Sequence, residues 1–250
     1  MKILLTNDDG IEAKGLITLA RVLEEAGHEL VVVAPASQHS AQSHAITLRR
    51  ALQVKRCHLE GISGRAYSVD GTPADCTRVG LEELLPDADL VFSGINQGYN
   101  AGMDILYSGT VSAAIEANVF RVSAVAVSAE FQQGDEDYDT AAVAAMDIFS
   151  RLSSFVTSQP MVLNINVPKA PYKGVEIAPL GGVVIDDYDV VHRGEDLSFR
   201  LVGRKRMTDE EKTDRVYLEQ GIATVTPLIY DLRNAPLLEA CQEAMKGGNS

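Results

Sequence analysis

The chain has 250 residues, 46% of them hydrophobic, which suits one large α/β domain or a core domain with a substantial appendage. Its 22 basic and 35 acidic residues give a net charge of −13, and that sign argues against a nucleic-acid polymer as a partner. No apolar run approaches the roughly 20 residues of a membrane helix, and the apolar start ends at Asn7, short of the roughly 7–15 apolar residues of a signal peptide, so we expect a cytoplasmic protein with no membrane partner.

The start of the chain has the pattern of a strand, a helix and a second strand. Residues 2–6 form a short apolar strand, and the leucines that follow recur at helical spacing until Gly27 ends the helix. The run at 30–34 does not alternate, as expected of a strand buried on both faces. The polar segment 36–45 that follows it is predicted to be a long functional loop.

The same alternation of strands and helices continues through the middle of the chain. Residues 67–70 predict a strand, after which Thr72 as N-cap and Pro73 at the first helical position begin a helix to about Leu85. The further expected elements are a strand at 89–93, a helix at 111–118, a strand at 122–127, a helix at 138–155 and a last core strand at 161–165. This order predicts a Rossmann-like, mostly parallel sheet with helices on both faces.

The character of the sequence changes after Pro168. Residues 181–204 are β-prone but polar, and residues 207–215 are strongly charged, without a self-contained hydrophobic pattern. We therefore expect a Rossmann-like catalytic core over 1–180 and a β-rich C-terminal appendage over 181–250. The appendage is predicted to pack on another protomer and to form a homodimer or homotetramer.

Polar residues follow the predicted strands at their carboxyl ends, which is where open parallel sheets bind ligands. Asp8 and Asp9 follow the first strand, Ser40 lies in the loop after the second, and Asn96 and the segment 108–110 come after the strand at 89–93. Two adjacent carboxylates at a buried strand end repel each other unless a cation neutralises them. Because all these candidate ligands are oxygens, Mg²⁺ or Mn²⁺ is favoured over zinc.

Each of these features also has an ordinary structural explanation. Asp-Asp-Gly commonly forms a turn, a serine in a polar loop is commonly just solvated, and Ser-Gly-Thr before a helix is good capping chemistry. His39 and His44 are either metal ligands, pH-sensitive groups or surface residues near the pocket entrance. The site hypothesis depends on the position of all these residues at one edge of one predicted sheet.

The chain carries seven segments in an order and spacing that are typical of a known family: KILLTNDDG at 2–10, VVVAP at 31–35 followed by Ser40, DGTPADC at 70–76, SGINQGYNAG at 93–102, YSGTVSAAIEA at 107–117, LNINVP at 163–168 and TD-x-x-YLEQGIATVTPL at 213–228. Together they resemble the SurE family of survival-protein phosphatases, which are acid-phosphatase-like 5′/3′-nucleotidases. The segments cover nearly the whole chain, and the first, fourth and fifth are the most specific.

The resemblance implies one divalent metal ion per subunit, Mg²⁺ or Mn²⁺, held by Asp8, Asp9, Ser40 and Asn96. It implies hydrolysis of phosphomonoesters, chiefly nucleoside 5′- and 3′-monophosphates and also short-chain polyphosphate. Dimers or tetramers that exchange their C-terminal segments are also implied.

The chain departs from the family pattern at three positions. Ala36 stands where an acidic residue is usual, Ala41 where Gly usually follows the metal-binding serine, and Ser112 where Gly is common. None of these changes removes a predicted ligand. The first two concern the conformation of the loop that carries Ser40, and therefore the substrate preference.

Phosphoryl transfer needs charge neutralisation and positioning more than covalent chemistry. Asp8 or Asp9 is expected to orient or deprotonate the attacking water, and His39 is a candidate donor of the proton to the leaving alkoxide. The start of the helix after Ser108 is a predicted anion site. The predicted catalytic residues are Asp8, Asp9 and Asn96, and the predicted substrate-binding residues are Asn7, Ser40, Asn100, Ser108, Gly109 and Thr110.

Three other functions compete with this hypothesis. A phosphoacceptor receiver domain needs Asp after its third strand and Lys after its fifth, but here the strands at 89–93 and 122–127 lead into Gly-Ile-Asn and Ser-Ala-Glu. A phosphatase of the haloacid-dehalogenase type needs Asp-x-Asp after its first strand, and Asp8-Asp9-Gly10 lacks it. A nucleotide-binding regulator without turnover is compatible with the sequence, and only an assay distinguishes it.

Overall fold

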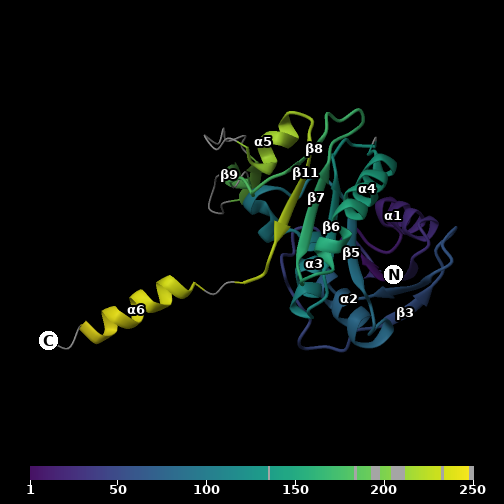
Figure 1. The fold of residues 1–250 in the computed structure, drawn as a ribbon, viewed down its shortest axis with the longest axis horizontal. Helices are drawn as coiled ribbons and strands as arrows, with labels where there is room; N and C mark the ends of the chain where they lie inside the picture. Colours follow the sequence, from purple (N-terminus) through teal and green to yellow (C-terminus); the bar gives the residue numbers. More distant parts are fainter. Residues whose placement is uncertain (135, 183–184, 193–197, 204–211, 232–233, 248–250) are drawn as a thin grey trace.

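The computed structural model describes residues 1–134, 136–182, 185–192, 198–203, 212–231 and 234–247. The strands found there are β1 (Lys2–Thr6), β2 (Glu29–Pro35), β3 (Val54–Cys57), β4 (Arg65–Val69), β5 (Leu90–Gln97), β6 (Ala124–Ala129), β7 (Val162–Val167), β8 (Val175–Ile177), β9 (Ile185–His192), β10 (Ser198–Gly203) and β11 (Ala223–Leu228). Within these ranges a 9-stranded sheet has the order β3-β4-β2-β1-β5-β6-β7-β11-β8 (Figure 1). Its pairs are parallel except β3 with β4 and β7 with β11, and β9 pairs with β10 separately.

Helices cover both faces of the large sheet. They are α1 (Lys14–Glu25), α2 (Pro73–Val79), a π-helical segment η1 (Gly80–Leu84), a 3₁₀ segment η2 (Gly102–Tyr107), α3 (Gly109–Val119), α4 (Tyr138–Val156), α5 (Asp214–Glu219) and α6 (Ala235–Gly247). The helices α1 and α4 pack on one face, and α2, η1 and α3 pack on the other. Among the described residues, no helix is both long enough and apolar enough to cross a bilayer.

The pleat of β1 explains why the sheet needs helices on both sides. Ile3 and Leu5 point into the core on the side of α1 and α4, whereas Leu4 points into the core on the side of α2 and α3. All three side chains are fully buried. This arrangement confirms the predicted Rossmann-like, mostly parallel α/β fold.

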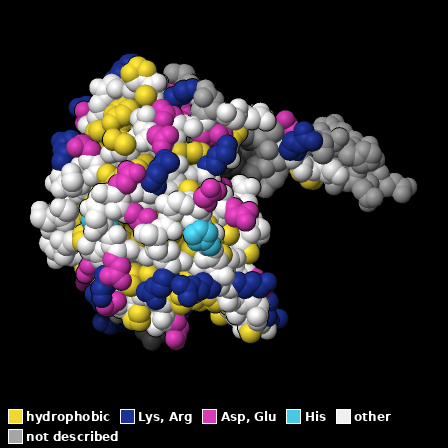
Figure 2. Space-filling view, turned by 90° about the vertical axis from the view of Figure 1, so that its right-hand side faces the viewer, with side chains coloured by type: hydrophobic (Ala, Val, Ile, Leu, Met, Phe, Trp, Pro, Cys, Tyr) yellow, Lys and Arg dark blue, Asp and Glu magenta, His cyan; other side chains and the backbone are white. Residues whose placement is uncertain are grey.

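The edge strand β3 differs from the buried strands because it exposes Lys55 and Arg56. Figure 2 looks onto this side of the molecule and shows Lys and Arg side chains gathered in a band. Charged side chains on an edge strand oppose pairing with a strand of another chain. Lys55 and Arg56 therefore protect this edge of the sheet.

The chain after residue 180 is only partly an appendage. The strand β11 lies inside the large sheet, antiparallel to β7 and parallel to β8, and its Ala223 and Val225 are buried. The strand predicted at 161–165 is therefore not the last core strand, and the predicted boundary between 180 and 181 does not separate the core from the rest. The charged run at 207–215 lies outside the described residues as far as position 211.

The helix α6 stands away from the body of the molecule (Figure 1). Residues 234–246 are all exposed. They include the apolar side chains of Leu237 and Leu238, each 60% exposed, and Met245, which is 81% exposed. An amphipathic helix in this position leaves an apolar face in water.

Candidate active site

The sheet changes its direction of growth at β1. From β1 the chain adds β2 and β4 on one side and later adds β5, β6 and β7 on the other. In open α/β sheets ligands bind at such a switch point, beyond the carboxyl ends of the strands. A pocket of about 520 Å³ lies there, and its lining includes Asp8, Asp9, Gln38, Ser40, Asn96, Gln97, Tyr99, Asn100, Asp104, Tyr107, Ser108, Glu130 and Arg215.

The two aspartates after β1 lie in an environment that disfavours two negative charges. Asp8 is only 4% exposed, and burial together with the charge of Asp9 raises its pKa to about 6. Burial also raises the pKa of Asp9, although hydrogen bonds from the Gln97 amide and the Gln38 side chain oppose the shift. A pair of this kind is well suited to a cation, which removes the repulsion between the two carboxylates.

The start of α3 holds Asp8 in place. The hydroxyl of Thr110 donates to Asp8 Oδ1, and the backbone amide of Thr110 also stabilises the carboxylate. Gly109 makes the approach possible, because a Cβ at this position would lie 2.7 Å from the Asp8 Cβ. The anion at this helix N-terminus is therefore the Asp8 carboxylate.

Asp9 is held from two other segments. Gln38 Nε2 donates to Asp9 Oδ1 at 3.0 Å, and the backbone amide of Gln97 donates to Asp9 Oδ2 at 3.2 Å. The donors come from the loop after β2 and from the end of β5. The polar loop and the glycine-rich segment thus meet at the second aspartate.

Asn96 and Ser40 complete the set of predicted metal ligands around the pocket. Asn96 Nδ2 donates to the Gly98 carbonyl at 2.8 Å, so its Oδ1 is the side-chain atom left for a ligand. Two residues before it, Gly94 has φ +138°, and a Cβ there would lie 2.4 Å from the Val127 carbonyl oxygen. Ser40 is exposed and lines the pocket from the loop. The structure therefore brings Asp8, Asp9, Ser40 and Asn96 to one cavity, and their oxygen atoms suit a hard divalent cation.

Several predicted substrate-binding residues have other partners. Asn7 is fully buried and bonds Gly10 through both polar ends of its side chain, so it closes the turn. Ser108 Oγ accepts from the Val111 amide at 3.1 Å and caps α3. Thr110 is fully buried against Asp8. The Asn7 amide and the Thr110 hydroxyl are thus used in supporting the site. Ser108 also lines the pocket, and its hydroxyl has a proton to donate there.

The predicted proton donor His39 does not line the pocket. Its Nδ1 lies 3.0 Å from Gln42 Oε1. Asn100 does line the pocket, and its backbone amide donates to Asn166 Oδ1 at 2.8 Å while its carbonyl accepts from Asn164 and Asn166. The sequence contained a signal for these two asparagines, since they alternate with apolar residues in a buried strand, where polar side chains need partners.

Part of the pocket wall comes from η2 and α5. Arg215 Nη1 lies 3.0 Å from Asp104 Oδ2. The neighbouring Asp214 is fully buried and accepts from the amides of Gly102 and Gly181, each at 2.8 Å. This carboxylate ties α5 to η2, so the C-terminal part of the chain contributes directly to the pocket.

A family model described as "Survival protein SurE" matches residues 3–186. The chain belongs to the SurE family. The 5′-nucleotidase SurE of Clostridium tetani is 41% identical over 243 residues, which cover 95% of this chain and 97% of that protein. The 5′-nucleotidase SurE of Clostridium botulinum strain 657 is 42% identical over 251 residues, which cover 97% and 98%.

The fold agrees with this membership. The crystal structure of the SurE protein from Aquifex aeolicus is 29% identical, with a TM-score of 0.83, and the match covers 98% of this chain and 100% of that one. The family resemblance predicted from the sequence is thus confirmed. Within this SurE-family fold, the pocket at the switch point contains the paired aspartates and both other predicted ligands.

Proposed function

We propose that the chain is a 5′-nucleotidase that hydrolyses nucleoside 5′-monophosphates, and also 3′-monophosphates, with one Mg²⁺ or Mn²⁺ held by Asp8, Asp9, Ser40 and Asn96. The names of the full-length relatives support the activity. The observation that carries the metal assignment is the pair of aspartates with raised pKa in an oxygen-lined pocket. When bound, the cation neutralises phosphate charge and polarises the scissile ester.

The residues of the chain then have distinct tasks. Thr110 and Gly109 keep Asp8 at the end of β1, while Gln38 and the Gln97 amide orient Asp9. Either aspartate is placed to orient or accept a proton from the attacking water. Asn100 is fixed by β7, and because its Nδ2 donates to Ser128 Oγ at 2.9 Å, its Oδ1 is the side-chain atom left for the substrate.

An assay of phosphate release tests this function. Nucleoside 5′- and 3′-monophosphates, sugar phosphates and short-chain polyphosphate should each be incubated with Mg²⁺, Mn²⁺ or EDTA. We expect release from the nucleotides with either metal ion and loss of release with EDTA. Binding of a nucleotide without release of phosphate would instead identify a non-catalytic regulator.

Thr110→Val tests the support of Asp8. The substitution keeps the volume and removes the hydroxyl that donates to the carboxylate, so one hydrogen bond to a charged group is lost, about 1.5 kcal/mol. We expect the Mn²⁺ concentration for half-maximal activity to rise roughly 10-fold, with KM for the nucleotide unchanged at saturating Mn²⁺. Ser108→Ala is the control, because loss of the α3 cap should lower Tm and leave the Mn²⁺ dependence unchanged. Equal Mn²⁺ dependence in Thr110→Val and the wild type would remove Thr110 from the site.

The exposed apolar face of α6 supports a proposal for assembly: the C-terminal segment packs on another protomer, in a homodimer or homotetramer. Light scattering at micromolar concentration should give at least a dimer for the full chain. The double variant Leu237→Lys/Leu238→Lys should dissociate, whereas Glu239→Lys, which makes the same change in the net charge of the helix without touching its apolar side chains, should not. A monomeric wild type would contradict the proposal.

A further inference from the structure

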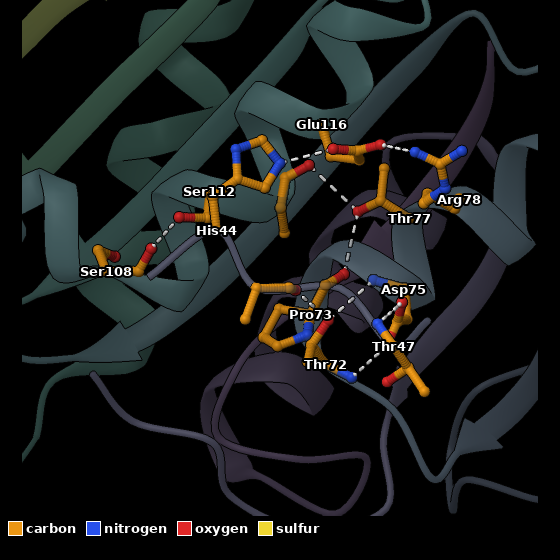
Figure 3. Close-up of polar contacts among 12 residues, drawn as sticks. His44, Thr47, Thr72, Pro73, Asp75, Thr77, Arg78, Ser108, Ser112 and Glu116 are labelled. Carbon is orange, nitrogen blue, oxygen red and sulfur yellow. Dashed lines mark hydrogen bonds and ion pairs between the residues drawn. The ribbon is translucent and has the colours of Figure 1, made fainter. Parts of the chain in front are cut away.

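A buried carboxylate outside the pocket joins three segments of the chain. Glu116 of α3 is only 4% exposed. His44 Nε2 donates to its Oε2 at 2.5 Å, and Arg78 Nη1 of α2 donates to its Oε1 at 2.7 Å (Figure 3). A buried carboxylate needs such partners, because it cannot exchange them for water. Neither His44 nor Glu116 lines the pocket.

His44 belongs to the loop at 36–47, which carries Ser40 to the pocket. This loop has an unfavourable backbone, since Ala41 and Ser43 have φ of 56° and 55°. Residues with a Cβ disfavour that left-handed conformation and keep it only when surrounding contacts enforce it. The structure must therefore contain anchors that hold the loop in this shape.

The loop is anchored at both ends. Near its start the His39 amide donates to the Asp8 carbonyl at 2.8 Å, and Gln38 Nε2 donates to Asp9 Oδ1 at 3.0 Å. Its other anchors lie on the His44 side. The Ser43 amide donates to the Tyr107 carbonyl at 3.1 Å, and Ser43 Oγ donates to the Leu106 carbonyl at 2.7 Å. Two further contacts tie the end of the loop to the start of α2: the Thr47 amide donates to Asp75 Oδ1 and Thr72 Oγ1 donates to the Ala45 carbonyl (Figure 3). Two of these anchors end on buried carboxylates, Asp75 and Glu116, and the His44 contact to Glu116 is the one made by a side chain of the loop.

The same helix holds both halves of the predicted metal site. Thr110 at the start of α3 fixes Asp8, and Glu116, six residues later and about 9 Å along the helix axis, fixes the loop with Ser40. The ring of Tyr230, which follows β11, packs edge-on against His44 with the centroids 5.9 Å apart. His44 is thus clamped between α3 and the C-terminal segment.

We infer that His44 is a positioning residue: its bond to Glu116 holds the loop at 36–47 in the conformation that brings Ser40 to Asp8 and Asp9. This inference rests on the proposed metal-dependent function. A purely structural role would make His44 and Arg78 equivalent, since both donate a hydrogen bond to Glu116. Positioning makes them different, because only His44 lies on the loop that carries Ser40.

Four variants of the full chain separate these roles by direct Mn²⁺ titration in a calorimeter and by hydrogen exchange of the metal-free protein. His44→Ala should weaken Mn²⁺ binding about 10-fold and speed exchange of the amides at 36–47, with kcat near wild type at saturating Mn²⁺. His44→Gln retains an N–H donor and should restore most of the affinity. Arg78→Gln should lower Tm but bind Mn²⁺ like the wild type. Asp9→Asn should lose Mn²⁺ binding.

The outcomes distinguish this inference from the proposed function. Wild-type affinity in Asp9→Asn would overturn the metal site itself. If Asp9→Asn loses binding, the metal site stands. In that case wild-type affinity in His44→Ala, or a weakening in Arg78→Gln equal to that in His44→Ala, would overturn the positioning role alone. If His44→Ala does not fold, His44→Phe keeps a ring against Tyr230 and removes the N–H donor, and unchanged Mn²⁺ affinity in that variant would also overturn it.

Discussion

Replacement of Asp9 by Asn is expected to lower turnover of a nucleoside 5′-monophosphate at limiting Mn²⁺ by about 100-fold or more, roughly 2.7 kcal/mol of transition-state stabilisation. The amide removes a negative charge from the proposed cation site but keeps an oxygen that accepts from Gln38 or the Gln97 amide. The fold should therefore stay intact. Activity measured over a range of Mn²⁺ concentrations, with circular dichroism as the check on folding, gives the result; full activity at limiting Mn²⁺ would refute the assignment.

The metal-free Asp9→Asn protein should be more stable than the metal-free wild type at pH 7. The pKa of Asp8 is raised from 3.8 to about 6, so its stabilising contribution is complete below pH 3.8 and is lost as the pH rises through 6. By linkage the ionised Asp8 then costs about 3 kcal/mol at neutral pH. Neutralising Asp9 relieves part of this cost and also the cost of burying Asp9 itself. Thermal unfolding in EDTA should show a Tm gain at pH 7 that shrinks towards pH 4, and a lower Tm for the variant at pH 7 would contradict the argument.

Gly109→Ala is expected to damage the site as strongly as the loss of a ligand. The added Cβ would lie 2.7 Å from Asp8 Cβ and 2.9 Å from Asp8 Oδ2, and both residues are buried. Asp8 or the start of α3 must then shift. Since a displacement of about 1 Å at a reacting centre lowers rates about 100-fold, we expect a fall of that size in kcat/KM together with weaker Mn²⁺ binding.

Gly80→Ala is the matched control for this substitution. Its Cβ would lie 2.5 Å from the Leu4 side chain, on the opposite side of β1 from α1 and away from the pocket lining. We expect this variant to lose thermal stability and to keep its Mn²⁺ dependence and kcat/KM. If Gly109→Ala behaves in the same way, the close approach of α3 to Asp8 serves packing only.

Much of the fold was predictable because its signals are local. The apolar runs at 2–6 and 30–34 and the capping pattern at Thr72 each specify an element from neighbouring residues, and the structure contains them. The strand β11 was not predicted as part of the core, because its partner β7 is about 60 positions earlier and its buried residues are mixed with threonines. Pairing over such a distance leaves no periodic signal in the strand itself.

The location of the candidate site was predictable from the sequence, but the hydrogen-bond partners of its residues were less so. Asp8, Asp9, Ser40 and Asn96 do line one pocket, although their roles stay a prediction. A sequence shows which side chains can donate a hydrogen bond but not which atoms accept it. The hydroxyl of Thr110 was therefore predicted to bind phosphate, whereas in the structure it donates to Asp8. The departure at Ala41 can now be interpreted, because φ of 56° is a conformation that glycine adopts more easily.

The two walls of the pocket differ in how freely evolution can alter them. The wall with the aspartates is made of the sheet and of α3, where almost any change disturbs the buried core. The wall with Arg215 and Asp104 is built from the short segments η2 and α5, which the Arg215–Asp104 ion pair and the buried Asp214 carboxylate join. Substitutions there can change the shape of the pocket around a nucleobase or sugar without moving the two aspartates. A lineage with this architecture can therefore diversify its substrates while its reaction stays the same.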